Sequence, residues 1–150
     1  MTMRLTTAQI GVLLAIATGI VGYVGGRLIG ERPPSAETWR VIRIVDGDTL
    51  VLECRPCGHH ERVRLADVDC PERGQPGAEA AAALLHDMVA GAELRLEPAA
   101  TPRDRWDRLV AFVWADGRLV NAELVRGGVA VYWPHDGRHA AEMAAGAGQK

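Results

Sequence analysis

Three short segments rich in Val, Ile and Leu, each bounded by turn-forming residues, constrain the fold of this chain most. They cover residues 39–45, 49–53 and 62–68. An Asp-Gly-Asp sequence at 46–48 separates the first two, and a Cys-Arg-Pro-Cys-Gly sequence at 54–58 separates the second from the third. Such residues between apolar runs are typical of the tight turns of β-hairpins. The pattern therefore predicts three consecutive antiparallel strands.

One longer element follows these strands. The alanine-rich segment from Gly77 to Val89 carries apolar residues at helical spacing, and Gly91 comes shortly after it, which predicts an amphipathic helix that ends there. Residues 92–97 and 109–114 have the composition of two further strands. Five strands with a helix inserted after the third predict an α+β fold of the OB type, a five-stranded Greek-key barrel that commonly binds nucleic acid.

The last third of the chain predicts one or two more short helices. Asn121 is expected to cap a helix that runs to Arg126 and stops at the two glycines that follow. Beyond Met143, residues 144–148 are only alanine and glycine, and glycine disfavours helix. We therefore expect the C-terminus to fray.

An apolar segment sets the N-terminal part of the chain apart. Residues 10–26 form an uninterrupted apolar run of about 17 positions, close to the length of a membrane span and of a signal-peptide core. Both interpretations mean export. Because no Ala-x-Ala cleavage site follows the run, we favour a retained membrane anchor over a cleaved signal peptide. Residues 1–30 are thus assigned to a signal anchor, the two-proline stretch 31–38 to a linker and residues 39–150 to one folded domain.

The charge balance limits the kinds of partner. The chain has a formal net charge of −2 at pH 7, which argues against a protein that coats nucleic acid through a generally basic surface. An enzyme that grips one phosphate through a few local arginines and a metal ion does not need a basic body. The composition therefore weakens a passive binder more than it weakens an enzyme acting on nucleic acid.

Five charged residues have the chemistry for metal-assisted attack on a phosphodiester. Asp48, Asp69 and Glu72 offer carboxylates that suit a hard cation or a water molecule. Arg64 and Arg108 offer guanidinium forks that suit a phosphate. Strict alternation along one strand would place Arg64 and Asp69 on opposite faces, so their convergence requires a bulge or bend between them.

The order and spacing of these residues resemble those of the staphylococcal nuclease, or thermonuclease-like, family. The resemblance runs from about Trp39 to Tyr132 and covers most of the globular region. The motifs that carry it are Val45-Asp46-Gly47-Asp48-Thr49-Leu50, Val63-Arg64-Leu65, Asp69-Cys70-Pro71-Glu72, Arg108-Leu109-Val110-Ala111 and Asp116-Gly117-Arg118-Leu119-Val120-Asn121. Each motif alone is weakly specific, whereas all of them in the family's order are a strong joint signal.

The resemblance implies a calcium-dependent nuclease that hydrolyses DNA, with RNA as a further substrate. It implies that Asp48, Asp69 and the backbone carbonyl of Cys70 hold one Ca²⁺, with Asp46 just outside the ligand set. It assigns activation of water to Glu72. Arg64 and Arg108 would then grip the scissile phosphate and stabilise the charge that builds on it. The family also implies a monomeric catalytic domain outside the cytoplasm.

The chain departs from the family pattern at several places. Asp107 stands where the family commonly has glycine, and it adds a negative charge beside Arg108 that is expected to weaken phosphate binding. The segment after Tyr132 is shorter than the usual terminal helix. Trp106, Tyr132 and Trp133 suit either stacking on a base or sugar or packing in the core.

The cysteines allow three interpretations. Cys54 and Cys57 lie at a predicted hairpin tip, with His59 and His60 just beyond. A disulfide fits an exported protein best. A zinc site would be one ligand short unless Cys70 is close, and two free thiols are the third alternative. Cys70 would be the unpaired thiol.

Two other functions compete with a nuclease. One is an OB-fold module that binds nucleic acid or protein and has lost catalysis, and the other is a redox or metal protein built on Cys54 and Cys57. The presence of all five charged residues argues against the first, because a binder has no reason to keep acids beside a phosphate. The second predicts activity without those acids.

Overall fold

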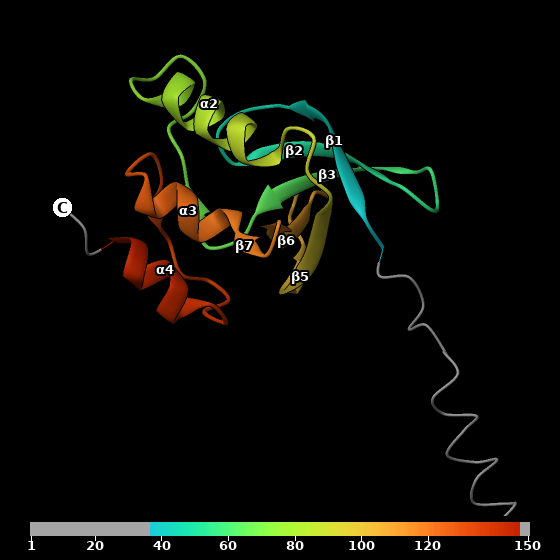
Figure 1. Cartoon of the computed structure of the whole chain (residues 1–150). Coiled ribbons are helices and arrows are strands. Elements are labelled where there is room, and N and C mark those ends of the chain that lie inside the picture. Colours follow the sequence, from blue (N-terminus) through green and yellow to red (C-terminus); the bar gives the residue numbers. More distant parts are fainter. Residues whose placement is uncertain (1–36, 148–150) are drawn as a thin grey trace, which may run out of the picture. The chain divides into compact units, whose positions relative to one another are not determined.

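A closed barrel of five strands forms the centre of the protein (Figure 1). The computed structural model describes residues 37–147. Strands β1, β2, β3, β5 and β6 lie side by side in the order β3-β2-β1-β5-β6. A parallel pairing of β3 with β6, in which Arg64 lies opposite Val110, closes the ring. Their bounds are Trp39–Ile44, Thr49–Cys54, His60–Leu65, Leu94–Arg103 and Leu109–Ala115.

The barrel confirms the predicted α+β fold of the OB type. The three expected hairpin strands pair antiparallel, with Thr49 opposite Arg64 between β2 and β3. Beta-branched and leucine side chains that alternate along the strands fill the interior, where Leu50, Leu52, Val63 and Phe112 are fully buried. The closing contact between β3 and β6 is long-range in sequence and leaves no exposed edge between these strands.

Two strand predictions had the wrong bounds. The third predicted strand, 62–68, is divided: β3 ends at Leu65, and β4 (Val68–Asp69) pairs instead with β8 (Val131–Tyr132) in a separate two-stranded sheet. The fourth was expected to end at Glu97, but β5 runs to Arg103. It does so because its pairing with β6 shifts register between Pro98 and Arg103. A short strand, β7 (Arg118–Leu119), pairs antiparallel with the end of β6.

Within residues 37–147, three helices flank the barrel (Figure 1). Helix α2 (Ala78–Val89) follows β4, as predicted, and buries one face made of Ala78, Ala81, Leu85 and Val89. Helices α3 (Val120–Arg126) and α4 (Ala140–Ala147) follow β7 and β8 and pack against each other.

Asn121 is not the cap of α3, which corrects the prediction. Leu119 is the cap residue, and Asn121 lies inside the helix, fully buried. Its Oδ1 accepts a hydrogen bond from Val113 N at 2.9 Å, and its Nδ2 donates to Ala66 O at 2.8 Å. The side chain therefore ties α3 to β6 and to the turn after β3, a role that depends on tertiary contacts.

Asn121→Ala is expected to lower the free energy of unfolding by about 3 kcal/mol, because it leaves buried backbone groups without partners. Urea denaturation monitored by tryptophan fluorescence measures this. The matched control is Glu123→Ala on the same helix, which removes a surface ion pair with Arg126 and is expected to change stability by less than about 1 kcal/mol. Equal losses in the two variants would contradict the bridging role.

The expected fraying after Met143 is also wrong within the described residues. Helix α4 continues to Ala147, and Met143 is fully buried. A Cβ atom on Gly146 would lie 2.9 Å from Arg126 N and 3.0 Å from Ala122 O. The glycine therefore lets α4 approach the backbone of α3 closely, and this packing outweighs its poor helix propensity.

The predicted signal anchor at residues 1–30 lies outside the described residues, as does most of the predicted linker. None of the helices between residues 37 and 147 is long and apolar enough to cross a membrane. The first strand begins at Trp39, the residue where the folded domain was expected to start.

Candidate active site

One cavity of about 470 Å³ brings the predicted site residues together. It is lined by Asp46, Asp48, Arg62, Arg64, Asp69, Glu72, Trp106 and Arg108. Five of these are the charged residues of the predicted site, and they come from four separate motifs of the chain. Cys70 does not line this cavity; it lines an adjoining one of about 960 Å³ together with Asp69 and Glu72.

The Asp-Gly-Asp turn presents Asp48 at the floor of the cavity. Asp48 N donates a hydrogen bond to Asp46 Oδ1 at 3.2 Å, which stabilises the turn between β1 and β2. A Cβ atom on Gly47 would lie 2.6 Å from Ala81 Cβ and 2.9 Å from Cys70 Cβ. Glycine is required here because α2 and the Cys70 loop pack directly on the turn.

Asp48 is a buried carboxylate held by three groups. Its Oδ2 accepts a hydrogen bond from Cys70 N at 3.0 Å and lies 3.1 Å from Arg64 Nη1, and its Oδ1 accepts one from Thr49 Oγ1 at 3.1 Å. Burial raises the pKa of Asp48 to about 6, although Arg64 and Cys70 N oppose the rise. A buried acid of this kind gains stability from a cation placed against it.

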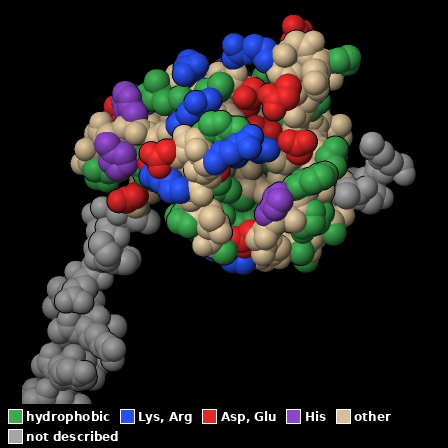
Figure 2. Space-filling view, turned by 180° about the vertical axis from the view of Figure 1, so that it is seen from behind, with side chains coloured by type: hydrophobic (Ala, Val, Ile, Leu, Met, Phe, Trp, Pro, Cys, Tyr) green, Lys and Arg blue, Asp and Glu red, His purple; other side chains and the backbone are tan. Residues whose placement is uncertain are grey.

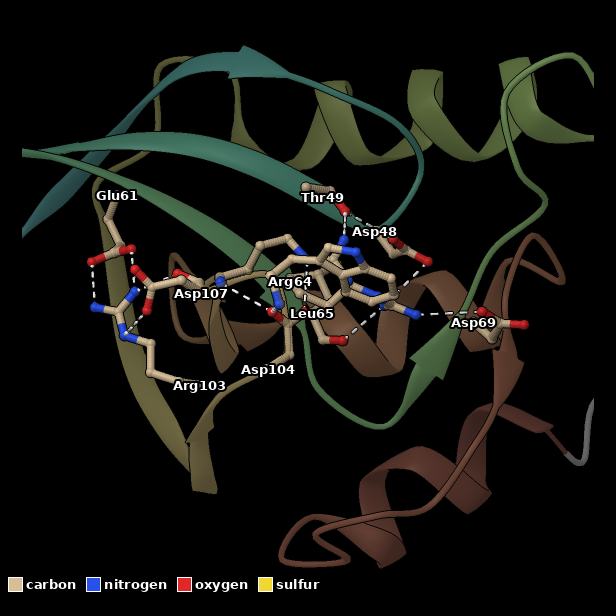
Figure 3. A network of polar contacts seen from close by, with 11 residues as sticks. Asp48, Thr49, Glu61, Arg64, Leu65, Asp69, Arg103, Asp104 and Asp107 are labelled. Atoms are coloured by element: carbon tan, nitrogen blue, oxygen red, sulfur yellow. Dashed lines mark hydrogen bonds and ion pairs between the residues drawn. The ribbon is translucent and has the colours of Figure 1, made fainter.

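A sharp bend brings Arg64 and Asp69 together, as the predicted convergence required. Asp67, between β3 and β4, adopts a left-handed conformation with φ of 56°. Arg64 Nη2 then donates to Asp69 Oδ1 at 3.3 Å, while its Nη1 faces Asp48 (Figure 3). The two carboxylates of Asp48 and Asp69 thus converge on one cationic group.

Arg108 enters the cavity from the turn before β6. Its Nε donates to Asp104 Oδ2 at 2.7 Å, and its Nη1 lies 3.3 Å from Thr49 Oγ1. Burial opposes ionisation of Asp104, but hydrogen bonds from Arg108 and from two backbone amides outweigh it and lower the pKa of this carboxyl. The Arg108 guanidinium lies over the ring of Trp106, with its carbon 4.9 Å from the ring centroid. Arg108 is therefore held in one orientation before any phosphate binds.

Asp107 does not place its charge against Arg108, contrary to the expectation from sequence. Its φ of 60° is left-handed, as glycine would allow, and its side chain is 93% exposed. Its ion-pair partner is Arg103, whose Nε lies 4.0 Å from Asp107 Oδ1. Arg103 also donates to Asp107 O at 3.0 Å and to both oxygens of Glu61 (Figure 3). The acid is therefore part of an anchor that holds the turn to β3.

Glu72 lies on the loop between β4 and α2 and is exposed at the cavity rim. Its backbone oxygen accepts a hydrogen bond from Gln75 N at 2.9 Å, so a tight turn carries it. Its carboxylate lines the same cavity as Arg64 and Arg108 and is accessible to water.

Comparison with known proteins identifies the family. The family model described as "Staphylococcal nuclease homologue" matches residues 62–147, more than half of the chain. The chain belongs to the staphylococcal nuclease family. It is similar to the thermonuclease of Staphylococcus intermedius, with 31% identity over 145 residues that cover 89% of this chain and 85% of the relative. The thermonuclease of Staphylococcus hyicus is 27% identical over 85% of this chain and 80% of its own length.

A shorter match links the chain to an uncharacterized endonuclease of Haemophilus influenzae. The two are 37% identical over 94 residues, which cover 62% of this chain and 51% of that relative.

The oxygen atoms of the site fit a hard divalent cation such as the Ca²⁺ expected for a staphylococcal nuclease. Asp48 and Asp69 already face one guanidinium from two sides, which shows that their carboxylates can share a cation. The Cys70 side chain does not line the cavity, and its Sγ lies 3.3 Å from Gly47 O. Burial raises the pKa of the Cys70 thiol to about 12, so it stays protonated and is no competing soft ligand.

The other open predictions have clear outcomes. Cys54 and Cys57 form a disulfide at the hairpin between β2 and β3, and Cys70 is the free, buried thiol. Trp106 and Trp133 are 59% and 57% exposed, so neither packs in the core, whereas Tyr132 packs against it. Trp133 lines a further cavity of about 670 Å³ that shares Arg64, Asp69 and Arg108 with the site.

Three supporting residues were not predicted. Thr49 contacts both Asp48 and Arg108, Asp104 holds Arg108, and Asp67 accepts hydrogen bonds from three successive backbone amides of residues 135–137, each at 2.8 Å. Only Asp104 had a local signal, because it lies four residues before Arg108. The contact of Thr49 with Arg108 and those of Asp67 with residues 135–137 join segments far apart in the chain and leave no pattern in the sequence.

Proposed function

We propose that this protein is a calcium-dependent nuclease that hydrolyses phosphodiester bonds of DNA, with RNA as a further substrate. The observation that carries the proposal is the single cavity in which Asp48, Arg64, Asp69, Glu72 and Arg108 meet. The family and its thermonuclease relatives support a nuclease, and the oxygen-only donor set supports the choice of cation.

Each side chain then has a role that follows from its place. Asp48, Asp69 and the carbonyl of Cys70 would hold the ion, which when bound polarises the phosphoryl oxygens. Arg64 and Arg108 bind the non-bridging oxygens and stabilise the charge that builds as water attacks phosphorus. Glu72 takes the proton of that water while the bond to the leaving oxygen breaks. The pairing of Arg108 with Asp104 and Trp106 holds its fork in place for this task.

A binding module is the second candidate, and the charge distribution argues against it. On the face shown in Figure 2, basic and acidic side chains are interspersed instead of forming one basic patch. Burying the carboxyl of Asp48 costs stability, which is typical of a residue that is kept for a functional role. Asp48 also lies where a bound phosphate would come close, which a passive binder would avoid. These features fit an enzyme better than a passive nucleic-acid binder.

Removal of divalent ions is expected to abolish hydrolysis of single-stranded DNA, and added Ca²⁺ is expected to restore it. Because Ca²⁺ binds only the folded protein, saturating ion should also raise the free energy of unfolding, by about 2.7 kcal/mol at one hundred times Kd. Acid-soluble nucleotide release and thermal melting measure the two effects. Asp48→Asn is the control that should lose both. Full activity in excess chelator would overturn the calcium requirement.

We further propose that the domain is exported, either anchored through residues 10–26 or secreted after cleavage, and that it acts as a monomer. The apolar run and the Cys54–Cys57 disulfide support export. Recovery of the protein in the cytosolic fraction, with both of these cysteines reduced, would contradict it.

A further inference from the structure

Three metal-ligating side chains gather at the end of the β2–β3 hairpin. Cys54, Cys57 and His59 place their ligand atoms within 4.8 Å of one another. This is the only such group of three or more His, Cys, Asp or Glu side chains found between residues 37 and 147. None of the three lines the candidate active-site cavity. The group therefore requires an explanation separate from the nuclease chemistry.

The backbone of the hairpin holds the three residues in one place. Gly58 N donates to Cys54 O at 2.8 Å, and Cys54 N donates to His59 O at 2.9 Å. Gly58 turns the chain with a φ of 70°, so that His59 returns beside the two cysteines. The ring of Trp39 packs edge-on against the imidazole, with centroids 5.2 Å apart. Cys54 is buried, whereas Cys57 and His59 are exposed to an incoming ion.

We propose that reduction of the Cys54–Cys57 disulfide converts this hairpin end into a site for a soft divalent cation such as Zn²⁺. Two thiolates and one imidazole, with a water molecule in the fourth position, form a known tetrahedral zinc environment, and two intervening residues are a usual spacing for its cysteines. Tetrahedral bonds of zinc length place ligand atoms roughly 3.5–3.8 Å apart. Rotation of the exposed Cys57 side chain away from Cys54 opens that space.

The two states exclude each other because they use the same sulfur atoms. An external dithiol transfers two electrons and two protons to the disulfide, which yields the two protein thiols and the cyclic disulfide of the reductant. Binding of the cation then displaces one proton from each thiol, and both sulfurs become thiolate ligands. In an oxidising compartment the disulfide therefore persists, and in a reducing compartment the two cysteines become available to bind the cation.

Two neighbouring residues provide controls. His60 follows His59 directly and is similarly exposed, but its Nε2 lies 3.6 Å from Glu53 Oε1 instead of facing the cysteines. Cys70 is the third thiol of the chain, and its Sγ contacts Gly47 O beside the candidate active site. Neither residue belongs to the proposed site.

The test uses the full-length protein and Co²⁺, whose tetrahedral thiolate complexes absorb visible light strongly. The protein is reduced with a dithiol, freed of it under argon and titrated with Co²⁺. We expect thiolate absorption that saturates at one ion per chain, that Zn²⁺ abolishes and that the oxidised protein lacks. Co²⁺ bound to the oxygen ligands of Asp48 and Asp69 does not produce these bands.

The variants assign the ligands. Cys57→Ser should remove the absorption, and His59→Ala should weaken Co²⁺ binding at least about tenfold, while His60→Ala and Cys70→Ser should leave it unchanged. Circular dichroism checks that each variant is folded. The proposal is wrong if reduced protein with both thiols titratable shows no thiolate absorption, if Cys57→Ser keeps it, or if oxidised protein binds equally well. None of these outcomes depends on nuclease activity.

Discussion

Glu72→Gln should lower the turnover number by about 10² to 10⁴ while leaving substrate affinity nearly unchanged. The amide keeps the size of the side chain but cannot accept the proton of water. Because a base acts on water chiefly in the transition state, its loss affects kcat more than binding. Glu72 is exposed and carried by a short turn at the cavity rim, so the substitution should not disturb the fold.

Single-turnover hydrolysis of a labelled single-stranded DNA in Ca²⁺ gives the rate, and fluorescence anisotropy gives the affinity. Glu79→Gln is the matched control, since Glu79 is an exposed glutamate in the first turn of α2 and does not line the cavity. Wild-type turnover in Glu72→Gln would show that the assigned mechanism is wrong even though the fold is right. A wild-type protein that binds DNA without cleaving it in Ca²⁺ would instead support the binding module.

Arg108→Ala should damage both rate and affinity, with a loss of about 10² to 10³ in kcat. An arginine that holds the phosphate contributes before the transition state as well as in it, so KM should rise as kcat falls. Arg108→Lys should recover little of the lost activity. The planar guanidinium fork of arginine can bond Asp104, Thr49 and a phosphate at once, and the ammonium group of lysine cannot.

The neighbouring Arg105 provides the control for Arg108. Its guanidinium packs over the ring of Trp106 at 3.9 Å from the centroid, and Arg105 does not line the cavity. Arg105→Ala removes the same charge from the same turn and should change kcat by less than about threefold, as expected for a solvated arginine. If the two alanine variants have equal activity, Arg108 acts only through the overall charge of the turn, and its assigned contact with phosphate is wrong.

Arg64 and Asp69 converge in a way that their positions along the chain do not predict. Both were candidates because of residue type and order, yet strict alternation placed them on opposite faces of one strand. The structure resolves this through Asp67, whose left-handed conformation ends β3 and starts β4. No local propensity indicates that bend, because aspartate adopts it here to bind the amides of residues 135–137, far away in the chain.

At Asn121 and Gly146, tertiary contacts override the local helix preferences of the residues. Each was interpreted by its local preference, as a helix cap and as a helix breaker. The burial of Asn121 against β6 and the close contact of Gly146 with α3 reverse both interpretations. Helix propensities are worth less than about 1 kcal/mol for each residue, so buried hydrogen bonds and close packing override them.

The sequence by itself determined the strands of the first hairpins, the inserted helix and the identity of the five charged residues. Alternation and turn chemistry act over a few neighbouring residues, and the order of the motifs is a property of the chain alone. Only the tertiary structure decided that these residues share one cavity. The parallel pairing of β3 with β6 places Arg64 opposite Val110, two residues from Arg108, and closes the barrel. Such a contact joins segments more than forty residues apart, and its stability comes from burial of the whole core instead of from any local pattern.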